Sequence, residues 1–155
     1  MIKERKYNEI LFELKDDVAW ITINRPQVLN AFREQTLDEL IEAVKSIRED
    51  ASIVAAVITG SGDRAFSAGG DFQAMMKLNR ANAMHWNDRM LGLAMAIRGA
   101  TVPVIAMVHG HCMGGGHELA LWCDLVISAD DGVFGQTGAK AVSYTHLTLP
   151  TILLV

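Results

Sequence analysis

Residues 110–118 combine a run of glycines with a carboxylate at the start of an apolar helix. They read Gly-His-Cys-Met-Gly-Gly-Gly-His-Glu. The first backbone N–H groups of a helix have no intrahelical acceptor, and glycines let a substrate oxygen approach them without meeting a Cβ. Such donors can hold the negative charge that develops on a thioester or ester oxygen. A tight turn packed against a strand is the alternative interpretation.

A second glycine turn, residues 66–71, lies earlier in the chain and ends in Gly-Gly-Asp. Each turn is preceded by an apolar run, at 54–59 and 102–108, that is typical of a buried parallel strand. We expect two neighbouring parallel strands to bring both turns to one edge of an α/β sheet. Ligands bind at such edges in open α/β folds.

Further segments predict the elements around these turns. Apolar stretches at 10–14 and 18–23, separated by Lys-Asp-Asp, indicate a β-hairpin. Apolar residues recur at helical spacing over 36–49, and 53–59 is typical of a strand, so we expect a right-handed crossover between parallel strands. Residues 73–97 are rich in methionine and helix formers. We interpret these methionines as core, with the lining of an acyl pocket as the alternative.

Six segments in a fixed order carry a resemblance to a known family. They are 24–32, 65–71, 103–106, 114–118, 123–124 and 134–136. From about Tyr7 to Lys140 the chain resembles the crotonase superfamily, also called the enoyl-CoA hydratase/isomerase family. The resemblance implies an α/β fold of the crotonase type, a spiral of repeated strand-strand-helix units, here truncated.

The resemblance also implies roles for single residues. The backbone N–H groups of Gly70 and Gly115 match an oxyanion hole for the thioester carbonyl of an acyl-CoA, where enolate charge would be held. Glu118 matches a glutamate with which hydratases of the family position and activate water. The candidate substrate-binding residues are Val28, Ala68, Gly69, Gly70, Asp71, Phe72, Met113, Gly114, Gly115 and Thr137. Asp71 has an alternative role as the cap of a helix that begins near Phe72.

The chain departs from the hydratase pattern at the second carboxylate. Hydratases and many isomerases carry it two residues after Phe-Gly-Gln, where this chain has Gly138. The segment 134–138 resembles instead the alicyclic ring-hydrolase and 1,4-dihydroxy-2-naphthoyl-CoA synthase branches, in some of which Gln-Thr-Gly is thought to bind bicarbonate as a substitute base. The synthase branch has an arginine at the position of Leu29 and no carboxylate at the position of Glu118. The ring hydrolases keep that glutamate and a Phe-Gly-Gln-x-Gly segment, so the alternatives remain open.

Composition favours a folded enzyme without a metal or a nucleic-acid partner. Half of the 155 residues are hydrophobic, and a formal net charge of -4 argues against unaided nucleic-acid binding. Cys112 and Cys123 lack a second pair of ligands, so we expect neither a disulfide framework nor a zinc site. We expect no cofactor besides the coenzyme A of the substrate, no membrane partner and a cytoplasmic location, because no signal-type apolar stretch follows the charged start. The family implies a homotrimer or hexamer, for which this chain is short.

The end of the chain differs from the rest. We divide the chain into a CoA-thioester-binding core, 1–140, and an atypical tail, 141–155, that contains no Asp, Glu, Lys or Arg. The uncharged stretch 148–155 is typical of an aggregation-prone strand when exposed. A frame-shifted or junction-derived end is one interpretation, and a final strand packed under the core is the other. With a foreign end, we would expect an inactive fragment, which either still binds CoA thioesters or can neither assemble nor bind.

Overall fold

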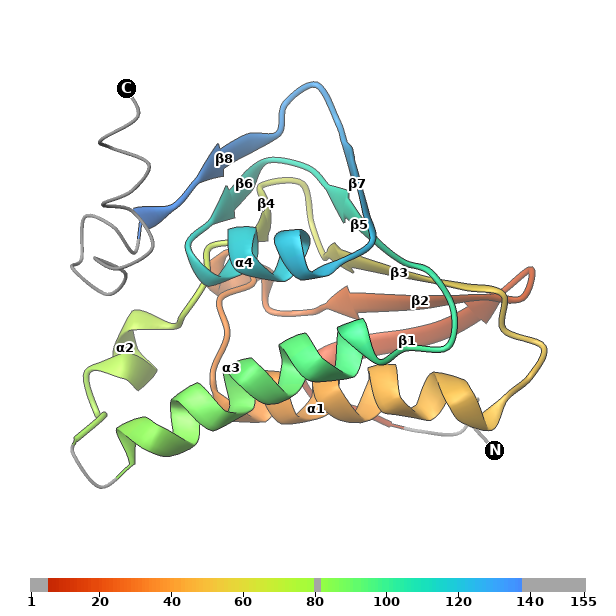
Figure 1. Ribbon diagram of the computed structural model, residues 1–155. Coiled ribbons are helices and arrows are strands. Elements are labelled where there is room, and N and C mark those ends of the chain that lie inside the picture. Colours follow the sequence, from red (N-terminus) through yellow and green to blue (C-terminus); the bar gives the residue numbers. More distant parts are fainter. Residues whose placement is uncertain (1–5, 80–81, 138–155) are drawn as a thin grey trace, which may run out of the picture.

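A five-stranded sheet forms the centre of the computed structural model, which describes residues 6–79 and 82–137 (Figure 1). Its strands lie in the order β1-β2-β3-β5-β7. They are β1 (Ile10–Lys15), β2 (Val18–Ile23), β3 (Ala55–Gly60), β5 (Val104–Val108) and β7 (Leu125–Ser128). The pair β1/β2 is the expected antiparallel hairpin, and Asp16 and Asp17 adopt positive φ in its turn. The other neighbouring pairs are parallel, which confirms the predicted parallel pairing of the strands before and after α1.

Three short parallel strands form a second sheet in the order β4-β6-β8. They are β4 (Ala65–Ser67), β6 (His111–Met113) and β8 (Val133–Gly135). The runs at 54–59 and 102–108 form β3 and β5, which are neighbouring parallel strands as expected, but the two glycine turns follow β4 and β6 of the second sheet. These longer strands, β3 and β5, end before the chain crosses into the second sheet, and the neighbouring strands β4 and β6 then bring the turns together.

The strands alternate between the two sheets along the chain. Each of the pairs β3/β4, β5/β6 and β7/β8 places its first strand in the five-stranded sheet and its second strand in the three-stranded sheet. Helical segments follow the first two pairs, which confirms the repeated strand-strand-helix unit expected from the sequence. The predicted boundary at residue 140, the tail 141–155 and Gly138 lie outside the described residues.

Two long helices, α1 (Glu34–Ser46) and α3 (Ala83–Arg98), lie side by side and cover one face of the larger sheet (Figure 1). Helix α1 begins two residues before the predicted start and ends in a 3-10 turn, η3 (Ile47–Glu49). Its buried side chains Leu37, Leu40 and Val44 recur at the spacing that suggested a helix. Helix α4 (Gly115–Trp122) packs against strands of both sheets, and the short α2 (Phe72–Met75) and η2 (Pro26–Val28) flank the glycine turns.

The core lies between α1, α3, α4 and the two sheets. Its largest fully buried side chains include Phe32, Phe66, Ile21, Ile58, Leu93 and Leu119. Strands β7 and β8 instead expose apolar side chains, among them Ile127 and Phe134. Within the two described ranges, no helix has the length and hydropathy needed to cross a bilayer.

Candidate functional site

The two glycine turns touch each other through their backbones. Gly69 has φ +89°, and a methyl group built on it would lie 2.8 Å from the backbone nitrogen of Gly115 and from the carbonyl oxygen of Met113. On the other side of the contact, a methyl group on Gly116 would lie 2.3 Å from the carbonyl oxygen of Ser67. Because real Cβ atoms do not approach backbone atoms so closely, only glycine fits at these two positions.

The first turn is held in place by the segment that precedes α1. The backbone N–H of Ala68 donates to the carbonyl oxygen of Leu29 at 2.9 Å. The N–H of Phe32 donates to Gly69 at 2.7 Å, and the N–H of Asp71 donates back to Phe32 at 2.6 Å. These two hydrogen bonds form an isolated parallel bridge between Phe32 and Gly70. Because Gly70 lies between the two bonded residues Gly69 and Asp71, its own N–H points away from the segment 29–32.

At the contact of the turns, two backbone donors have no acceptor in the described part of the chain. Gly115 is the first residue of α4, so its N–H has no intrahelical partner. Across residues 6–79 and 82–137, neither the Gly70 N–H nor the Gly115 N–H donates to a protein acceptor. Two such donors, carried by turns in backbone contact, can bind one oxygen atom that gains negative charge.

Glu118 lies on α4, about one helical turn after Gly114, to whose carbonyl its N–H donates at 3.0 Å. Its half-buried carboxylate accepts a hydrogen bond from the Gln136 side-chain amide at 3.2 Å. The other side-chain atom of that amide, Gln136 Oε1, is buried and has no hydrogen-bond partner among the described residues. His117 packs edge-on against Phe134, with ring centroids 5.8 Å apart.

Apolar side chains fill the space beside the glycines. A methyl group on Gly70 would lie 2.5 Å from Met75 Sδ and 3.3 Å from Trp86 Cζ2. A methyl group on Gly115 would lie at ordinary contact distance from Phe32 and Met90. Met75 and Met90 therefore adjoin the two turns. Met75, Met76, Met84 and Met95 are exposed, so the expectation that the methionines of this stretch are core is wrong for them.

The remaining predicted residues lie around these turns. Ala68, Met113 and Gly114 are in the turns or at their edges, and the Gly114 N–H donates to the carbonyl oxygen of Gly135 at 2.8 Å. Thr137 is exposed, with its hydroxyl 2.9 Å from a methyl group built on Gly114. Val28 and Phe72 are exposed at the two flanks, on η2 and α2.

Asp71 caps α2 and is also part of an ion-pair network. One of its carboxylate oxygens accepts from the N–H groups of Gln73 and Ala74 at 3.0 and 3.3 Å, as expected for the capping role. The other accepts from Arg25 at 3.0 Å. Although burial raises the pKa of Asp71, the hydrogen bonds from Arg25 and from the α2 backbone outweigh it, and the pKa lies below its ordinary value.

Glu9 forms the other end of this network. It lies directly before β1 and accepts hydrogen bonds from Arg33 and Thr36, while Arg25 Nε lies 3.4 Å from the same carboxylate. Burial raises the pKa of Glu9, but the two hydrogen bonds and the two arginine charges lower it more, and the net shift is downward. This network was not predicted from the sequence.

The completely buried Asn30 is a second residue whose role was missed. Its side-chain amide donates to the backbone carbonyl oxygens of Ser61 and Ala65 at 2.9 and 2.8 Å, and the backbone carbonyl oxygen of Asn30 accepts from the Ser67 hydroxyl at 2.8 Å. The Ser67 hydroxyl in turn accepts from the Gly69 N–H at 3.1 Å. The family resemblance could have pointed to these roles, because the segments that carry it include Arg25, Asn30 and Gln136.

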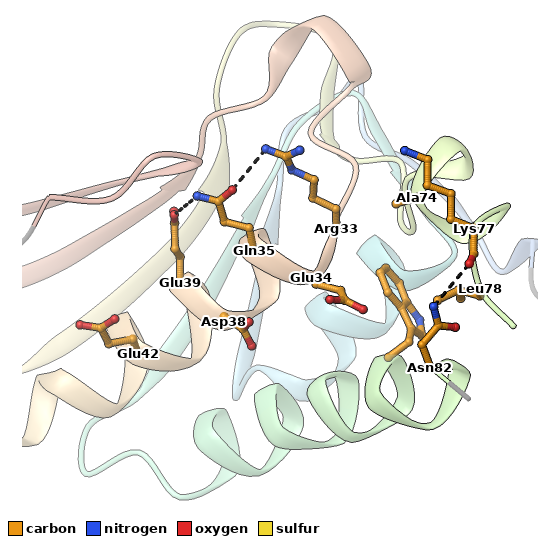
Figure 2. Close-up of a pocket in the computed structure, with 11 residues that line it drawn as sticks. Arg33, Glu34, Gln35, Asp38, Glu39, Glu42, Ala74, Lys77, Leu78 and Asn82 are labelled. Carbon is orange, nitrogen blue, oxygen red and sulfur yellow. Dashed lines mark hydrogen bonds between the residues drawn. The ribbon is translucent and has the colours of Figure 1, made fainter. Parts of the chain in front are cut away.

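A groove of about 620 Å³ lies between α1, α2 and the start of α3 (Figure 2). It is lined by Arg33, Glu34, Gln35, Asp38, Glu39, Glu42, Ala74, Lys77, Leu78, Asn82 and Trp86. Figure 2 shows Arg33, Gln35 and Glu39 joined in one hydrogen-bonded chain along α1, with bonds of 3.3 and 3.0 Å. The groove contains none of the predicted site residues. Trp86 lines the groove and also lies beside Gly70.

The described part of the chain offers no group of three His, Cys, Asp or Glu side chains placed to hold a metal ion. Burial raises the pKa of the Cys112 thiol to about 11 and that of Cys123 to about 12. Both cysteines are therefore neutral thiols at physiological pH.

Comparison with known proteins identifies the family. A family model described as enoyl-CoA hydratase/isomerase matches residues 13–152. The chain belongs to the enoyl-CoA hydratase/isomerase family, and its two-sheet α/β architecture is the crotonase fold. The match continues past Lys140, where the resemblance noted in the sequence ends.

The present chain covers between 52% and 59% of the length of the following three solved structures. An enoyl-CoA hydratase/carnithine racemase from Magnetospirillum magneticum is 33% identical with a TM-score of 0.83, over 88% of this chain and 52% of that chain. An enoyl-CoA hydratase from Mycobacterium smegmatis is 34% identical with a TM-score of 0.82, over 86% and 52%. An enoyl-CoA hydratase from Bacillus anthracis is 27% identical with a TM-score of 0.85, over 96% and 59%.

Proposed function

We propose that the chain carries the oxyanion site of an enzyme that acts on acyl-CoA thioesters. The Gly70 and Gly115 N–H groups bind the thioester oxygen and stabilise the enolate that forms when the α-carbon loses a proton or when water adds to the β-carbon of an enoyl group. The observation that carries this proposal is a pair of backbone donors, on two turns in backbone contact, that have no acceptor among the residues the structure describes. Each donor of this kind contributes about 3 kcal/mol to transition-state stabilisation.

Glu118 is the proposed acid/base. It follows Gly115 by about one helical turn, which places its carboxylate on the same end of α4 as the donor. The hydrogen bond from Gln136 fixes one carboxylate oxygen, so the other is available to take a proton from water or from substrate. Hydration or isomerisation of an enoyl-CoA follows if Glu118 transfers protons while the two amides hold the enolate.

A ring-opening hydrolase is the second candidate function. Glu118 and the Phe-Gly-Gln-Thr segment occur together in this chain, and the buried Gln136 Oε1 has no partner among the described residues. In this version a water molecule donates a hydrogen bond to Gln136 Oε1, and Glu118 takes its other proton as the water oxygen attacks the ring carbonyl. The 1,4-dihydroxy-2-naphthoyl-CoA synthase alternative is weaker, since Leu29 stands where that branch has an arginine.

The whole-protein properties are proposals as well, because the chain spans about half the length of the solved structures it matches. We propose an acyl-CoA thioester as the partner, no cofactor besides its coenzyme A, and a cytoplasmic location. If the site is incomplete in a chain of this length, the chain binds CoA thioesters without turning them over.

The first experiment follows turnover by mass spectrometry with a panel of enoyl-CoA and cyclic oxo-acyl-CoA thioesters. Glu118→Gln should abolish turnover, whereas the control Glu13→Gln, at an exposed position on β1, should not. Turnover retained in Glu118→Gln refutes the acid/base role. If the folded wild-type chain turns over none of the thioesters, the enzymatic proposal fails, and thermal stabilisation by a thioester then identifies a binding protein.

A second pair of variants tests the donor itself. Gly115 is the first residue of α4, where proline is tolerated, so Gly115→Pro removes the N–H with little cost to the helix. Gly115→Ala keeps the N–H and adds a methyl group at ordinary contact distances of 3.4 to 3.5 Å. We expect turnover to fall by about 10²–10³-fold in the proline variant relative to the alanine variant. Equal turnover in the two variants would exclude Gly115 as a donor to the reacting oxygen.

A further inference from the structure

Arg25 is a buried cation that joins three acceptors from separate parts of the chain. The residue is 9% exposed. Its Nη1 donates to the carbonyl oxygen of Ala31 at 2.5 Å, its Nη2 donates to the Asp71 carboxylate at 3.0 Å, and its Nε lies 3.4 Å from Glu9 Oε1. The guanidinium thus connects the start of β1, the segment before α1 and the first glycine turn.

The contacts of Arg25 lie on both sides of the bridge that orients Gly70. Ala31 precedes Phe32, the residue that pairs with the first turn, and Asp71 follows Gly70 directly. Arg25 therefore binds the carbonyl group of Ala31, directly before Phe32, and the side chain of Asp71, directly after Gly70. The second Asp71 oxygen is occupied by the α2 backbone, so the Asp71 side chain is fixed at both oxygens.

Stability alone does not explain a buried ion pair of this kind. Replacing buried ion pairs by apolar residues is often neutral or stabilising, because removing the charges from water is costly. In an oxyanion site, by contrast, displacing a group by about 1 Å can reduce the rate about 10²-fold. The planar, five-donor guanidinium can hold Ala31 and Asp71 at a fixed spacing, which a lysine ammonium cannot do.

We propose that Arg25 is a positioning residue: through Asp71 and Ala31 it fixes the direction of the Gly70 N–H toward the reacting oxygen. This inference rests on the proposed function of Gly70. Arg25 itself does not touch the substrate, and its effect on the reaction passes through the backbone of the first glycine turn.

The test compares Arg25→Lys and Asp71→Asn with the wild-type chain. Asp71→Asn keeps an oxygen that can cap α2 and removes the charge that faces Arg25, so it perturbs the positioning even if Arg25→Lys fails to fold. The control is Arg33→Gln, which removes another cation from the same Glu9 at a half-exposed position without touching Asp71. Folding is checked by circular dichroism and thermal unfolding.

Two readouts separate positioning from general damage. One is the division of the effect between kcat and KM for the best thioester of the panel. The other is the near-ultraviolet absorption of acetoacetyl-CoA, whose enolate accumulates on a protein that stabilises it. We expect kcat to fall about 10- to 100-fold in Arg25→Lys and Asp71→Asn with KM changed less than about threefold, and the enolate absorption to fall with kcat. Arg33→Gln should keep the wild-type kcat and the wild-type enolate absorption.

The outcomes distinguish this inference from the proposed function. If the wild-type chain gives no enolate absorption and no turnover, the proposed function fails and the inference falls with it. If the wild-type chain gives both, and folded Arg25→Lys or Asp71→Asn matches it, only the positioning role of Arg25 is refuted. A rise in KM at constant kcat also refutes it, because that pattern indicates lost binding of the ground state.

Discussion

Replacing Gly69 by alanine should separate the two glycine turns and so impair the proposed oxyanion site. Alanine at φ +89° costs about 1–2 kcal/mol of stability for its left-handed backbone. The new Cβ would lie 2.8 Å from the Gly115 nitrogen, so the second turn must retreat by about 0.6 Å to reach ordinary contact. Overpacking of this kind costs about 1–3 kcal/mol more. A shift of this size between the two donors should lower kcat about tenfold or more.

Gly62→Ala is the matched control, because Gly62 also has a positive φ, +76°, but its nearest neighbour would be Pro26 Cβ at 3.4 Å. Urea unfolding and thioester turnover are measured for both variants. We expect Gly62→Ala to lose about 1–2 kcal/mol of stability and to keep its turnover. We expect Gly69→Ala to lose more stability and most of its turnover. If the two variants lose equal stability and turnover, the contact between Gly69 and Gly115 does not control the site.

Three further predictions concern stability. Leu93→Ala, at a completely buried position, should lower the free energy of unfolding by about 2–5 kcal/mol, whereas Leu91→Ala, 63% exposed on the same helix, should change it by less than about 0.5, as measured by urea unfolding. The pKa values of Glu9 and Asp71 are lowered on folding, so the stability they contribute is present above their unfolded pKa and is lost as pH falls through the folded values. The thermal unfolding temperature should therefore fall more steeply below about pH 4 in wild type than in Asp71→Asn. An equal pH dependence of the two unfolding temperatures would contradict this. Burial raises the pKa of Cys123 to about 12, so its thiol should resist alkylation at pH 8 until the chain is unfolded, and stability should decline as pH rises above about 9, where the unfolded thiol ionises. Rapid labelling of the native chain would contradict the buried position.

The sequence predicted the elements whose pattern is local. The hairpin at β1 and β2, helix α1 and the parallel strands β3 and β5 follow from apolar periodicity and turn residues. Strands β4, β6 and β8 have only three residues each, too few for a period-two pattern, and so the second sheet was not predicted from periodicity. The start of α1 was misplaced because the N-cap is Arg33, with the Thr36 hydroxyl accepting from its backbone N–H, and not a Ser, Thr, Asp or Asn.

The site was predictable where glycines and a nearby carboxylate mark it, and not where contacts join distant segments. Nothing near Glu9 in the sequence indicates that its carboxylate reaches Arg33 and Thr36. In the same way, the hydrogen bond between Gln136 and Glu118 and the contact of Trp86 with Gly70 depend on how β8 and α3 pack in space. Local spacing cannot give such long-range contacts, because they are set by the arrangement of the two sheets.

The proposed donors at Gly70 and Gly115 are main-chain atoms, and this decides how the site can change in evolution. A mutation alters side chains, and proline is the one residue that deletes a backbone N–H, so most substitutions nearby leave both donors in place. The side chains beside these donors, among them Met75 and Trp86, can by contrast be replaced without removing either N–H group. A lineage could therefore exchange the acyl group it accepts, or the acid/base it uses, one residue at a time, while the chemistry of holding an anionic oxygen is inherited unchanged.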